Sequence, residues 1–335
     1  MHDFITVVGA GSWGTAIALH IARGNRQVIL VTNSAAHAAD IIANKENKKY
    51  IPRVKFPDNI LVTDDLEFAL HKSSLVLIMT PSKVFKECLM NIKRYMLPDT
   101  LICWGCKGVG FVNGEVRFFD KIVEDVFGYK QSLAVIGGPS FAKEVAQESP
   151  TAIVVATNND MVGKKLVNAL HHGNMRCYSS TDVVGVELCG VLKNVLAVAA
   201  GISDGLGLGA NTRSALITRG IAEMHRLGSS LGIKASTLMG LAGVGDIILS
   251  CTSDMSRNRR LGLGLGRGML LQDVLKEIGQ VVESVENIDF VIGLAKQYNV
   301  ALPISEQVAA VVSGKVSPKQ AVTALLSRES KPEFV

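Results

Sequence analysis

The sequence VVGAGSWG at Val7–Gly14 joins the end of an apolar run to three glycines with the spacing G-x-G-x-x-G. The apolar run Phe4–Val8 predicts a buried strand, and the residues Thr15–Ala22 behind the glycines predict a helix. A strand, a glycine-rich turn and a helix N-terminus in this order are typical of dinucleotide-binding folds. The stretch therefore predicts a dinucleotide site in a parallel α/β domain.

The three glycines have separate expected roles in this turn. Gly9 permits the tight turn, Gly11 lets the backbone approach a pyrophosphate, and Gly14 lets helix and strand pack closely. The helix N-terminus then offers free N–H groups and the positive end of a dipole to the phosphates. The alternative is a glycine turn that serves packing alone.

Short apolar runs continue through the first half of the chain. Helix-forming segments separate them, so we expect an open parallel sheet whose ligands bind beyond the carboxyl ends of the strands. The expected strands after the first are Gln27–Val31, Leu75–Met79, Leu101–Trp104, Leu133–Ile136 and Ala152–Ala156. The turns that follow two of them, at Lys107 and at Gly138–Ser140, are predicted to face the cofactor crevice.

The end of the second expected strand is the place where such a fold contacts the adenosine ribose. An Asp or Glu there binds the 2′-hydroxyl and repels a 2′-phosphate, but this chain has Thr32, Asn33 and Ser34. With Asn33 as the candidate contact, the sequence tolerates NADP and slightly favours NADPH. No Arg stands there to hold the extra phosphate, so NAD stays open.

Beyond residue 180 the pattern changes to long helical segments. We expect a dinucleotide-binding domain over residues 1–180 and an all-α substrate domain over residues 181–335. The most apolar stretch, Val183–Ile202, contains Glu187, Lys193 and Asn194, which argues against a membrane span. The expected helices are about 183–202, 211–231, 235–241, 256–265, 270–278, 283–298, 304–312 and 318–327.

The composition is that of a globular protein with a modest positive charge. Of the 335 residues, 48% are hydrophobic and 19% charged, and the formal net charge is +5. Basic residues are mostly scattered and aromatic residues are few, so no nucleic-acid partner is expected. Asp3 and Gly9 interrupt any apolar run of a signal peptide, so we expect a cytoplasmic protein. A homodimer is one option that the sequence leaves open.

The six cysteines are expected to be reduced thiols in the core. Cys103 and Cys106 have the C-x-x-C spacing of some redox and metal sites, but no second ligand pair has a spacing suited to zinc. His171 and His172 are expected in a polar loop. No metal site is predicted.

Lys193 lies in a helical stretch with no ordinary polar face. The residues one turn away on either side are Cys189, Gly190, Leu196 and Ala197. We expect the ammonium to be partly desolvated or to lie in a cleft, and desolvation would lower its pKa and suit proton exchange near neutrality. The alternative is a solvated surface lysine.

The cluster SRNRR at Ser256–Arg260 is the densest group of basic residues. Ser256 is expected to cap a helix and to place Arg257 and Asn258 in its first turn, where free N–H groups and a guanidinium favour an anion. The alternative is that the cluster is a run of solvated surface charges. We interpret Arg259 and Arg260 in this way.

Two acidic residues stand next to apolar segments, Asp246 in LAGVGD and Glu283 in GQVVE. Each is either a ligand contact or a surface cap, and composition leaves both options open.

Seven blocks of the sequence, taken in order, resemble the bacterial type of NAD(P)-dependent glycerol-3-phosphate dehydrogenase. They span nearly the whole chain, and seven blocks in order are far more specific than any one motif. The blocks are Gly9–Ala16, Lys107–Gly108, Gly138–Ala142, Leu192–Asn194, Gly243–Asp246, Ser256–Arg259 and Val281–Glu283.

The resemblance implies a Rossmann domain followed by a helical domain similar to that of 6-phosphogluconate dehydrogenase. It implies interconversion of dihydroxyacetone phosphate and sn-glycerol 3-phosphate, chiefly for phospholipid synthesis, with Lys193 as proton acceptor. The implied substrate contacts are Lys107, Gly138, Ser140, Lys193, Asp246, Ser256, Arg257 and Asn258. The implied cofactor contacts, beside Gly9, Gly11, Gly14 and Asn33, are Ser12, Trp13, Lys107, Ala142, Arg257, Val281 and Glu283.

The chain departs from the family pattern at two places. Relatives commonly carry an aromatic residue and then His or Arg where this chain has Val31 and Asn33, which affects the adenosine contacts. Cys106 stands where the family often has Thr, and little effect is expected.

Two other functions remain as alternatives at this stage. One is another two-domain dehydrogenase, such as a hydroxyacid or ketopantoate reductase, and the other is a nucleotide-sensing module without turnover. The basic cluster at Ser256–Asn258 favours a phosphorylated substrate, and Lys193 argues against a sensing module.

Overall fold

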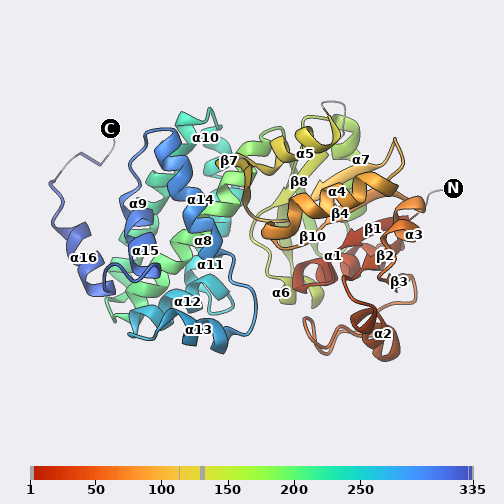
Figure 1. Ribbon diagram of the computed structural model, residues 1–335, viewed down its shortest axis with the longest axis horizontal. Coiled ribbons are helices and arrows are strands. Elements are labelled where there is room, and N and C mark those ends of the chain that lie inside the picture. The colour runs from red at the N-terminus through yellow and green to blue at the C-terminus, as the bar shows by residue number, and fades with distance from the viewer. Residues whose placement is uncertain (1–3, 113, 129–132, 331, 334–335) are drawn as a thin grey trace. The chain divides into compact units, whose positions relative to one another are not determined.

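The computed structural model describes residues 4–112, 114–128, 133–330 and 332–333, which form two compact units (Figure 1). The first unit contains the described residues up to Gly190 together with Met239–Gly245. The second contains Val191–Leu238 and the described residues from Asp246 onward. The functional division expected after residue 180 stays a prediction.

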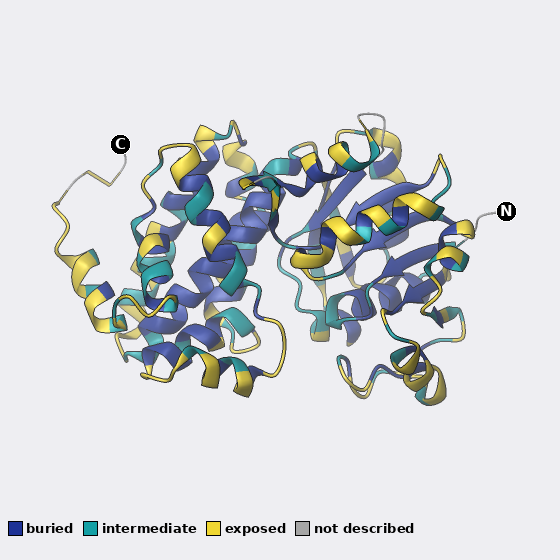
Figure 2. Ribbon diagram, viewed as in Figure 1, coloured by how far each residue is buried: buried dark blue, intermediate teal, exposed yellow. Residues whose placement is uncertain are grey.

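An eight-stranded sheet forms the centre of the first unit, in the order β10-β9-β8-β5-β4-β1-β2-β3. Its inner strands consist mainly of buried apolar residues, as expected of a parallel sheet, and they are largely dark blue in Figure 2. The strands are β1 (Phe4–Val8), β2 (Gln27–Val31), β3 (Ile60–Thr63), β4 (Ser73–Ile78), β5 (Leu101–Trp104), β8 (Leu133–Gly137), β9 (Thr151–Ala156) and β10 (Met175–Ser180).

The two strands at the edges of this sheet, β3 and β10, were not predicted from the sequence. In both strands, buried or half-buried side chains are mixed with exposed ones. β10 has the sequence MRCYSS, and only its Met175 is buried. An edge strand needs no continuous apolar run, so the pattern that predicted the inner strands is weak there.

The predicted parallel sheet is confirmed, with one antiparallel pair of strands that was not predicted. β9 runs antiparallel to β8, with Val135 opposite Ala156, and β10 runs parallel to β9. The helix between β8 and β9 is α6 (Ala142–Ala146), which has five residues and spans about 7.5 Å. A strand of six residues spans about 20 Å. A helix this short cannot carry the chain back along the length of β8. β9 therefore starts near the end of β8 and runs in the opposite direction.

Three helices of the first unit, α2, α3 and α7, begin at a side-chain cap. Ser34, Asp65 and Asn159 each accept a hydrogen bond from a backbone N–H in the first turn of the helix they precede. The glycine-led helix α1 (Ser12–Arg23) has no such cap. The other helices and a small antiparallel hairpin are α2 (Ala35–Asn44), α3 (Leu66–His71), a 3₁₀ turn (Ser82–Val84), α4 (Phe85–Tyr95), β6 (Val109–Val112), β7 (Glu115–Phe118), α5 (Phe119–Phe127) and α7 (Asp160–Leu170).

The described residues of the second unit form helices alone, as expected. Ser317 begins the last helix with a capping box to Gln320, followed by Pro318 at the first helical position. The helices are α8 (Val183–Gly205), which starts in the first unit, α9 (Gly209–Ser230), α10 (Ala235–Leu238), α11 (Asp246–Thr252), α12 (Arg257–Gly266), α13 (Leu271–Ile278), α14 (Ser284–Gln297), α15 (Pro303–Val312) and α16 (Pro318–Leu326).

Helix α11 was not predicted. The expected helix over 235–241 ends early as α10, and a π-helical turn, Leu241–Gly245, leads into α11. The turn closes with a hydrogen bond from the backbone N–H of Gly245 to the carbonyl oxygen of Gly240 at 3.1 Å. Glycines have low helix propensity, so the sequence pattern predicted no helix there.

Helices α8 and α12 cross at closely spaced glycines. A Cβ on Gly201 would lie 2.1 Å from the carbonyl oxygen of Arg259, and one on Gly262 would lie 2.0 Å from that of Val198. Gly205 and Gly266, one turn further along each helix, are equally crowded by backbone. The two backbones therefore touch directly, and no other residue type fits at the crossing.

Two helical stretches, Val183–Gly205 and Ala235–Thr252, are long and apolar enough to meet a composition test for membrane spans. The apolar window of the first is 89% buried inside the protein, which is typical of a core helix. The window of the second is 39% buried and is interrupted by the π-helical turn. Length and composition are weak grounds for a membrane span in these two stretches.

Candidate active site

The glycine turn after β1 has the geometry that the sequence predicted. Gly9 has φ +112°, and a Cβ there would lie 2.8 Å from the carbonyl oxygen of Met79. A Cβ on Gly14 would lie 1.9 Å from the carbonyl oxygen of Gly9, so α1 packs directly on the turn. Gly9 therefore provides the tight turn and Gly14 the close helix packing.

Gly11 differs from its two neighbours because it faces open space. No atom lies within 4 Å of a Cβ built on Gly11, which is the N-cap of α1. Since no side chain caps this helix, the backbone N–H groups at Ser12 and Trp13 keep their capacity to bind an anion. The turn thus fits the pyrophosphate of a dinucleotide.

Trp13 and Asn33 lie on different sides of this turn. A Cβ on Gly105 would meet the Trp13 indole nitrogen at 2.7 Å, so the ring packs against the backbone that follows β5. Asn33 is exposed just after β2, between Thr32 and Ser34, whose side chains bond to local backbone. No acidic side chain occupies these three positions.

Lys107 follows β5 and is half-buried. Its backbone carbonyl accepts a hydrogen bond of 2.6 Å from the Ser82 hydroxyl, and its side chain passes 3.6 Å from the position of a Cβ on Gly190 of α8. The side chain of this lysine therefore lies within ordinary van der Waals range of α8, and Ser82 holds the backbone of the loop.

A buried acid that sequence reasoning missed lies beside this loop. Glu187 of α8 accepts hydrogen bonds from the Trp104 indole at 3.1 Å and from the backbone N–H of Asp120 at 3.2 Å. Its Oε2 has no hydrogen-bond partner among the described residues. Burial, with the nearby Asp120 carboxyl, raises the pKa of Glu187 well above its usual value. Burial therefore favours the protonated form of this carboxyl, and its contact with Trp104 ties α8 to the end of β5.

The turn after β8 holds three more predicted residues. Gly138 has φ +112° and lies against the backbone of Ala152 and Ile153 in β9. The Ser140 hydroxyl donates a hydrogen bond of 2.9 Å to the carbonyl oxygen of Gly138 and so tightens this turn. Ala142 begins α6 and is half-buried.

A deeply buried ion pair of the second unit joins Lys193 of α8 to Asp246, the first residue of α11. The Lys193 Nζ lies 2.7 Å from Asp246 Oδ1 and donates a second hydrogen bond, of 3.2 Å, to the Ser250 hydroxyl. The exposed fractions of the two charged side chains are 7% and 2%. The expected desolvation of Lys193 is confirmed, and Asp246 is a buried partner rather than a surface cap.

The two charges of such a buried pair depend on each other for stability. Taking both charges out of water is expensive, and their mutual attraction offsets much of that cost. Removal of either partner leaves the other charge buried, at a cost of about 3–5 kcal/mol. The Asp246 carboxylate stabilises the ammonium form of Lys193, so a proton is held at a fixed point in this unit.

The N-terminus of α12 carries the predicted anion cluster. Ser256, 5% exposed, is the N-cap and accepts a hydrogen bond from the backbone N–H of Arg259 at 3.2 Å. Arg257 is the first helical residue and is half-exposed. The Asn258 amide donates to Asn194 Oδ1 at 2.8 Å and accepts from the backbone N–H of Ser284 at 3.2 Å. Asn258 therefore ties α12 to α8 and α14.

The interpretation of Arg259 as a solvated surface charge is wrong. It is 8% exposed and forms ion pairs with Asp204 and Asp254. Its partners are distant or on a loop, so no local pattern indicated burial. Arg260 is exposed, as expected.

Val281 and Glu283 lie in the segment that enters α14. Val281 is 57% exposed, and Glu283 is the N-cap of α14 without a side-chain capping bond. The Glu283 carboxylate is thus not used as a cap.

Sequence reasoning missed two polar residues of the second unit that contact predicted site residues. Ser250 lies one turn after Asp246 on α11, so its role became visible only with that helix. Asn194 is 2% exposed and its bond to Asn258 joins positions 64 residues apart. Its adjacency to Lys193 was the one available signal.

The cysteines and histidines show no metal cluster within the part of the chain that the structure describes. None of the six cysteines, all of which the structure describes, forms a disulfide, and burial raises the pKa of Cys103 well above its usual value. His171 and His172 lie in the loop between α7 and β10, where His172 stacks on His20 with ring centroids 4.1 Å apart.

Comparison with known proteins assigns both halves of the chain to one family. The profile described as NAD-dependent glycerol-3-phosphate dehydrogenase N-terminus matches residues 4–163, and the C-terminus profile of the same family matches residues 182–323. The chain is 46% identical over 332 residues to "Glycerol-3-phosphate dehydrogenase [NAD(P)+]" of Stenotrophomonas maltophilia (strain R551-3), covering 99% of this chain and 97% of that one.

Solved structures agree with this assignment. The crystal structure of glycerol-3-phosphate dehydrogenase from Coxiella burnetii matches with a TM-score of 0.93 and 43% identity, covering 97% of this chain and 99% of the other. A ketopantoate reductase family structure from Ralstonia eutropha shares only the fold, with 13% identity, a TM-score of 0.61, and coverage of 95% and 99%. With two family profiles matched in order and this identity over its full length, the chain belongs to the NAD-dependent glycerol-3-phosphate dehydrogenase family.

Proposed function

We propose that this protein interconverts dihydroxyacetone phosphate and sn-glycerol 3-phosphate by hydride transfer with NAD or NADP. Family membership and the names of the relatives support the reaction. The observation that carries the proposal is the buried Lys193 ammonium, held 2.7 Å from Asp246 and 3.2 Å from Ser250. This arrangement supports Lys193 as the source of an exchangeable proton, because the neighbouring Asn194 bonds to Asn258 of the predicted anion site.

Lys193 acts as the general acid–base group. In reduction, its ammonium donates a proton to the oxygen at C2 as that oxygen gains negative charge, and in oxidation the neutral amine takes the proton back from the hydroxyl. A bound nicotinamide supplies or accepts the hydride at C2. Asp246 stabilises the ammonium before the reaction, and Ser250 fixes the direction of its N–H bonds. Acid–base help of this kind contributes a factor of about 10²–10⁴.

The substrate phosphate is recognised by the first turn of α12. Ser256 uses its side chain to cap the helix, while Arg257 carries a half-exposed guanidinium at the first helical position. A guanidinium and a helix N-terminus both favour a dianion. The other proposed substrate contacts are Lys107, Gly138, Ser140 and Asn258, taken from the family resemblance.

The cofactor pyrophosphate binds the turn at Gly9, Gly11 and Gly14. The open space at Gly11 and the uncapped N-terminus of α1, with Ser12 and Trp13, support this placement. Asn33, without an adjacent acid, slightly favours NADPH. The further proposed contacts are Lys107, Ala142, Arg257, Val281 and Glu283.

We propose supply of the glycerol backbone of phospholipids as the role in the cell, and a small phosphorylated ligand rather than nucleic acid as the partner. Six cysteines without a disulfide support a reducing, cytoplasmic compartment. A homodimer is the assembly to test by sedimentation.

The test is a spectrophotometric assay of dihydroxyacetone phosphate reduction with NADPH and NADH side by side. We expect turnover with at least one cofactor, and a preference for NADPH supports the interpretation of Asn33. A parallel assay uses a hydroxyacid and ketopantoate as substrates. Turnover of either, with none of dihydroxyacetone phosphate, would contradict the proposal. Tight cofactor binding with no turnover of any of these substrates would indicate a sensing module instead.

A further inference from the structure

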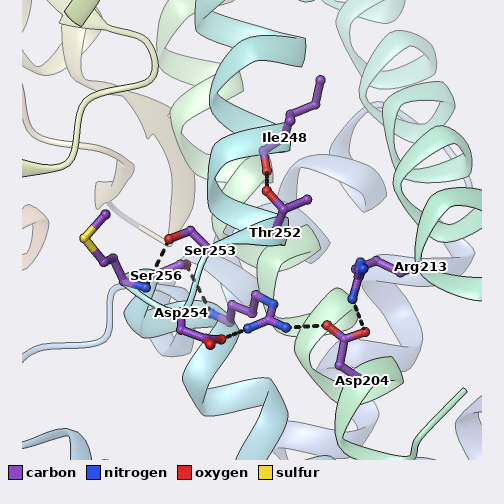
Figure 3. A network of polar contacts seen from close by, with 9 residues as sticks. Asp204, Arg213, Ile248, Thr252, Ser253, Asp254 and Ser256 are labelled. Carbon is purple, nitrogen blue, oxygen red and sulfur yellow. Dashed lines mark hydrogen bonds and ion pairs between the residues drawn. The ribbon is translucent and has the colours of Figure 1, made fainter. Parts of the chain in front are cut away.

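The buried guanidinium of Arg259 joins two acidic residues from separate segments. It pairs with Asp204 Oδ2, near the end of α8, at 2.5 Å, and it also pairs with Asp254, which lies in the loop before α12 (Figure 3). Asp204 is itself paired with Arg213 of α9 at 2.9 Å. The four side chains form a continuous chain of charges, two positive and two negative.

The burial of these charges is uneven along the chain of contacts. The side chains of Arg259 and Asp204 are 9% and 10% exposed, whereas Asp254 is 83% exposed. Arg259 and Asp204 are therefore anchored in the helical core. Asp254 is a surface residue that the anchored guanidinium holds in place.

Backbone contact already sets the spacing of α12 from α8. Gly201 and Gly262 bring the backbones of α8 and α12 into direct contact, including at the carbonyl oxygen of Arg259. A contact of this kind sets the distance between the helices without any side chain. The contribution of the Arg259 side chain is thus at the loop that it reaches, residues 253–256.

That loop leads directly into the predicted anion site. The backbone N–H of Ser256 donates a hydrogen bond of 3.1 Å to the carbonyl oxygen of Ser253. The backbone N–H of Met255 donates another, of 3.2 Å, to the Ser253 hydroxyl. Figure 3 labels Ser253 and Ser256 in this turn. These bonds make a compact turn that ends at the N-cap. A guanidinium that holds Asp254, in the middle of the turn, therefore orients Ser256 and the residue after it.

We propose that Arg259 is a positioning residue for the phosphate-recognition turn Ser256–Asn258. It sets the affinity for the phosphate-bearing substrate through Asp254 and the loop, without touching the substrate. This inference rests on the proposed function, because that function assigns the substrate phosphate to the turn.

The test compares Arg259→Lys with Arg260→Lys, its exposed neighbour on the same helix. Lysine keeps the charge but lacks the planar fork that pairs with two carboxylates at once. For Arg259→Lys we expect the KM for dihydroxyacetone phosphate to rise about tenfold, with kcat within about threefold and the KM for NADPH unchanged. Inhibition by inorganic phosphate should weaken by a similar factor. Arg260→Lys should leave all of these constants unchanged.

A second variant, Asp254→Asn, covers the case in which Arg259→Lys does not fold. Asp254 is 83% exposed, so its substitution leaves the core intact. We expect the KM for dihydroxyacetone phosphate to rise about two- to fourfold, because exposed ion pairs contribute little. The melting temperature should stay within about 1 °C of the wild-type value.

Two results would overturn the role of Arg259. One is an unchanged KM for dihydroxyacetone phosphate in both Arg259→Lys and Asp254→Asn. The other is a parallel loss of kcat, of NADPH affinity and of melting temperature, which would show a purely structural residue. Wild-type protein that fails to reduce dihydroxyacetone phosphate contradicts the proposed function alone. Calorimetric titration with inorganic phosphate, in wild type and Arg259→Lys, then still tests whether Arg259 supports the anion site.

Discussion

The glycine turn of the first unit and the lysine pair of the second unit are built in different ways. Gly9, Gly11 and Gly14 lie within six residues of each other, and their work is done by backbone atoms. Lys193 and Asp246 are 53 residues apart and meet only when α11 packs against α8. The first site is a property of a local sequence, and the second is a property of tertiary packing. This difference decides which substitutions damage folding and which damage chemistry alone.

Substitution of Asp246 should have the largest effect on stability. Asp246→Asn removes the carboxylate that offsets the burial of Lys193, and we expect a loss of about 3–5 kcal/mol of unfolding free energy. The double variant Lys193→Met/Asp246→Leu replaces both charges by apolar groups and should recover most of that loss while staying inactive. Urea denaturation of the three proteins measures the effect. A double variant that is no more stable than Asp246→Asn would contradict a coupled pair.

Two alanine substitutions, Gly14→Ala and Gly11→Ala, test the glycine turn of the first unit. Gly14→Ala puts a methyl group 1.9 Å from the carbonyl oxygen of Gly9 and should cost about 3 kcal/mol of stability. Gly11→Ala meets nothing within 4 Å and should leave the melting temperature unchanged. Its effect should appear in fluorescence titration with NADPH as a weaker affinity. Equal stability of the two variants would disprove the separate roles of these glycines.

Arg257→Ala should act on substrate affinity rather than on folding. The lost hydrogen bonds to a charged phosphate correspond to about 2 kcal/mol, or roughly a thirtyfold higher KM for dihydroxyacetone phosphate. The affinity for inorganic phosphate should fall in parallel. Steady-state kinetics over a range of substrate concentrations checks this, and an unchanged KM would remove Arg257 from phosphate recognition.

The smallest expected effect is a pH-dependent change in stability at Glu187. Burial raises the pKa of this carboxyl, so the folded protein keeps a proton that the unfolded chain releases above its ordinary pKa of 4.5. The wild type therefore loses stability as pH rises above that value. Glu187→Gln cannot ionise, and its melting temperature relative to wild type should increase by roughly 2 °C between pH 5 and pH 8. A constant difference across this range would mean that Glu187 is ionised in the folded protein.

Much of the first unit could be predicted from the sequence because its signals are local. The apolar runs predicted the inner strands, and the glycine spacing predicted the turn at Gly9–Gly14 with its geometry. The edge strands β3 and β10 and the reversed direction of β9 escaped prediction. They depend on solvent exposure and on the short α6, neither of which produces a periodic pattern.

The second unit could be predicted as helical, but its polar contacts could not. The apolar neighbours of Lys193 within its own helix indicated burial, and the structure confirms it. The partner Asp246 stayed ambiguous because glycines around Leu241–Gly245 hid α11. Arg259 was assigned to the surface because Asp204, its main partner, lies 55 residues away.

The most direct test of the account is single-turnover oxidation of NADPH with saturating dihydroxyacetone phosphate, compared between wild type and Lys193→Ala. Cofactor affinity is measured on the same samples by fluorescence titration. We predict that Lys193→Ala binds NADPH with nearly wild-type affinity and loses a factor of about 10²–10⁴ in the rate of hydride transfer. A variant that transfers hydride at a near-wild-type rate would contradict the assignment of Lys193 as the proton donor.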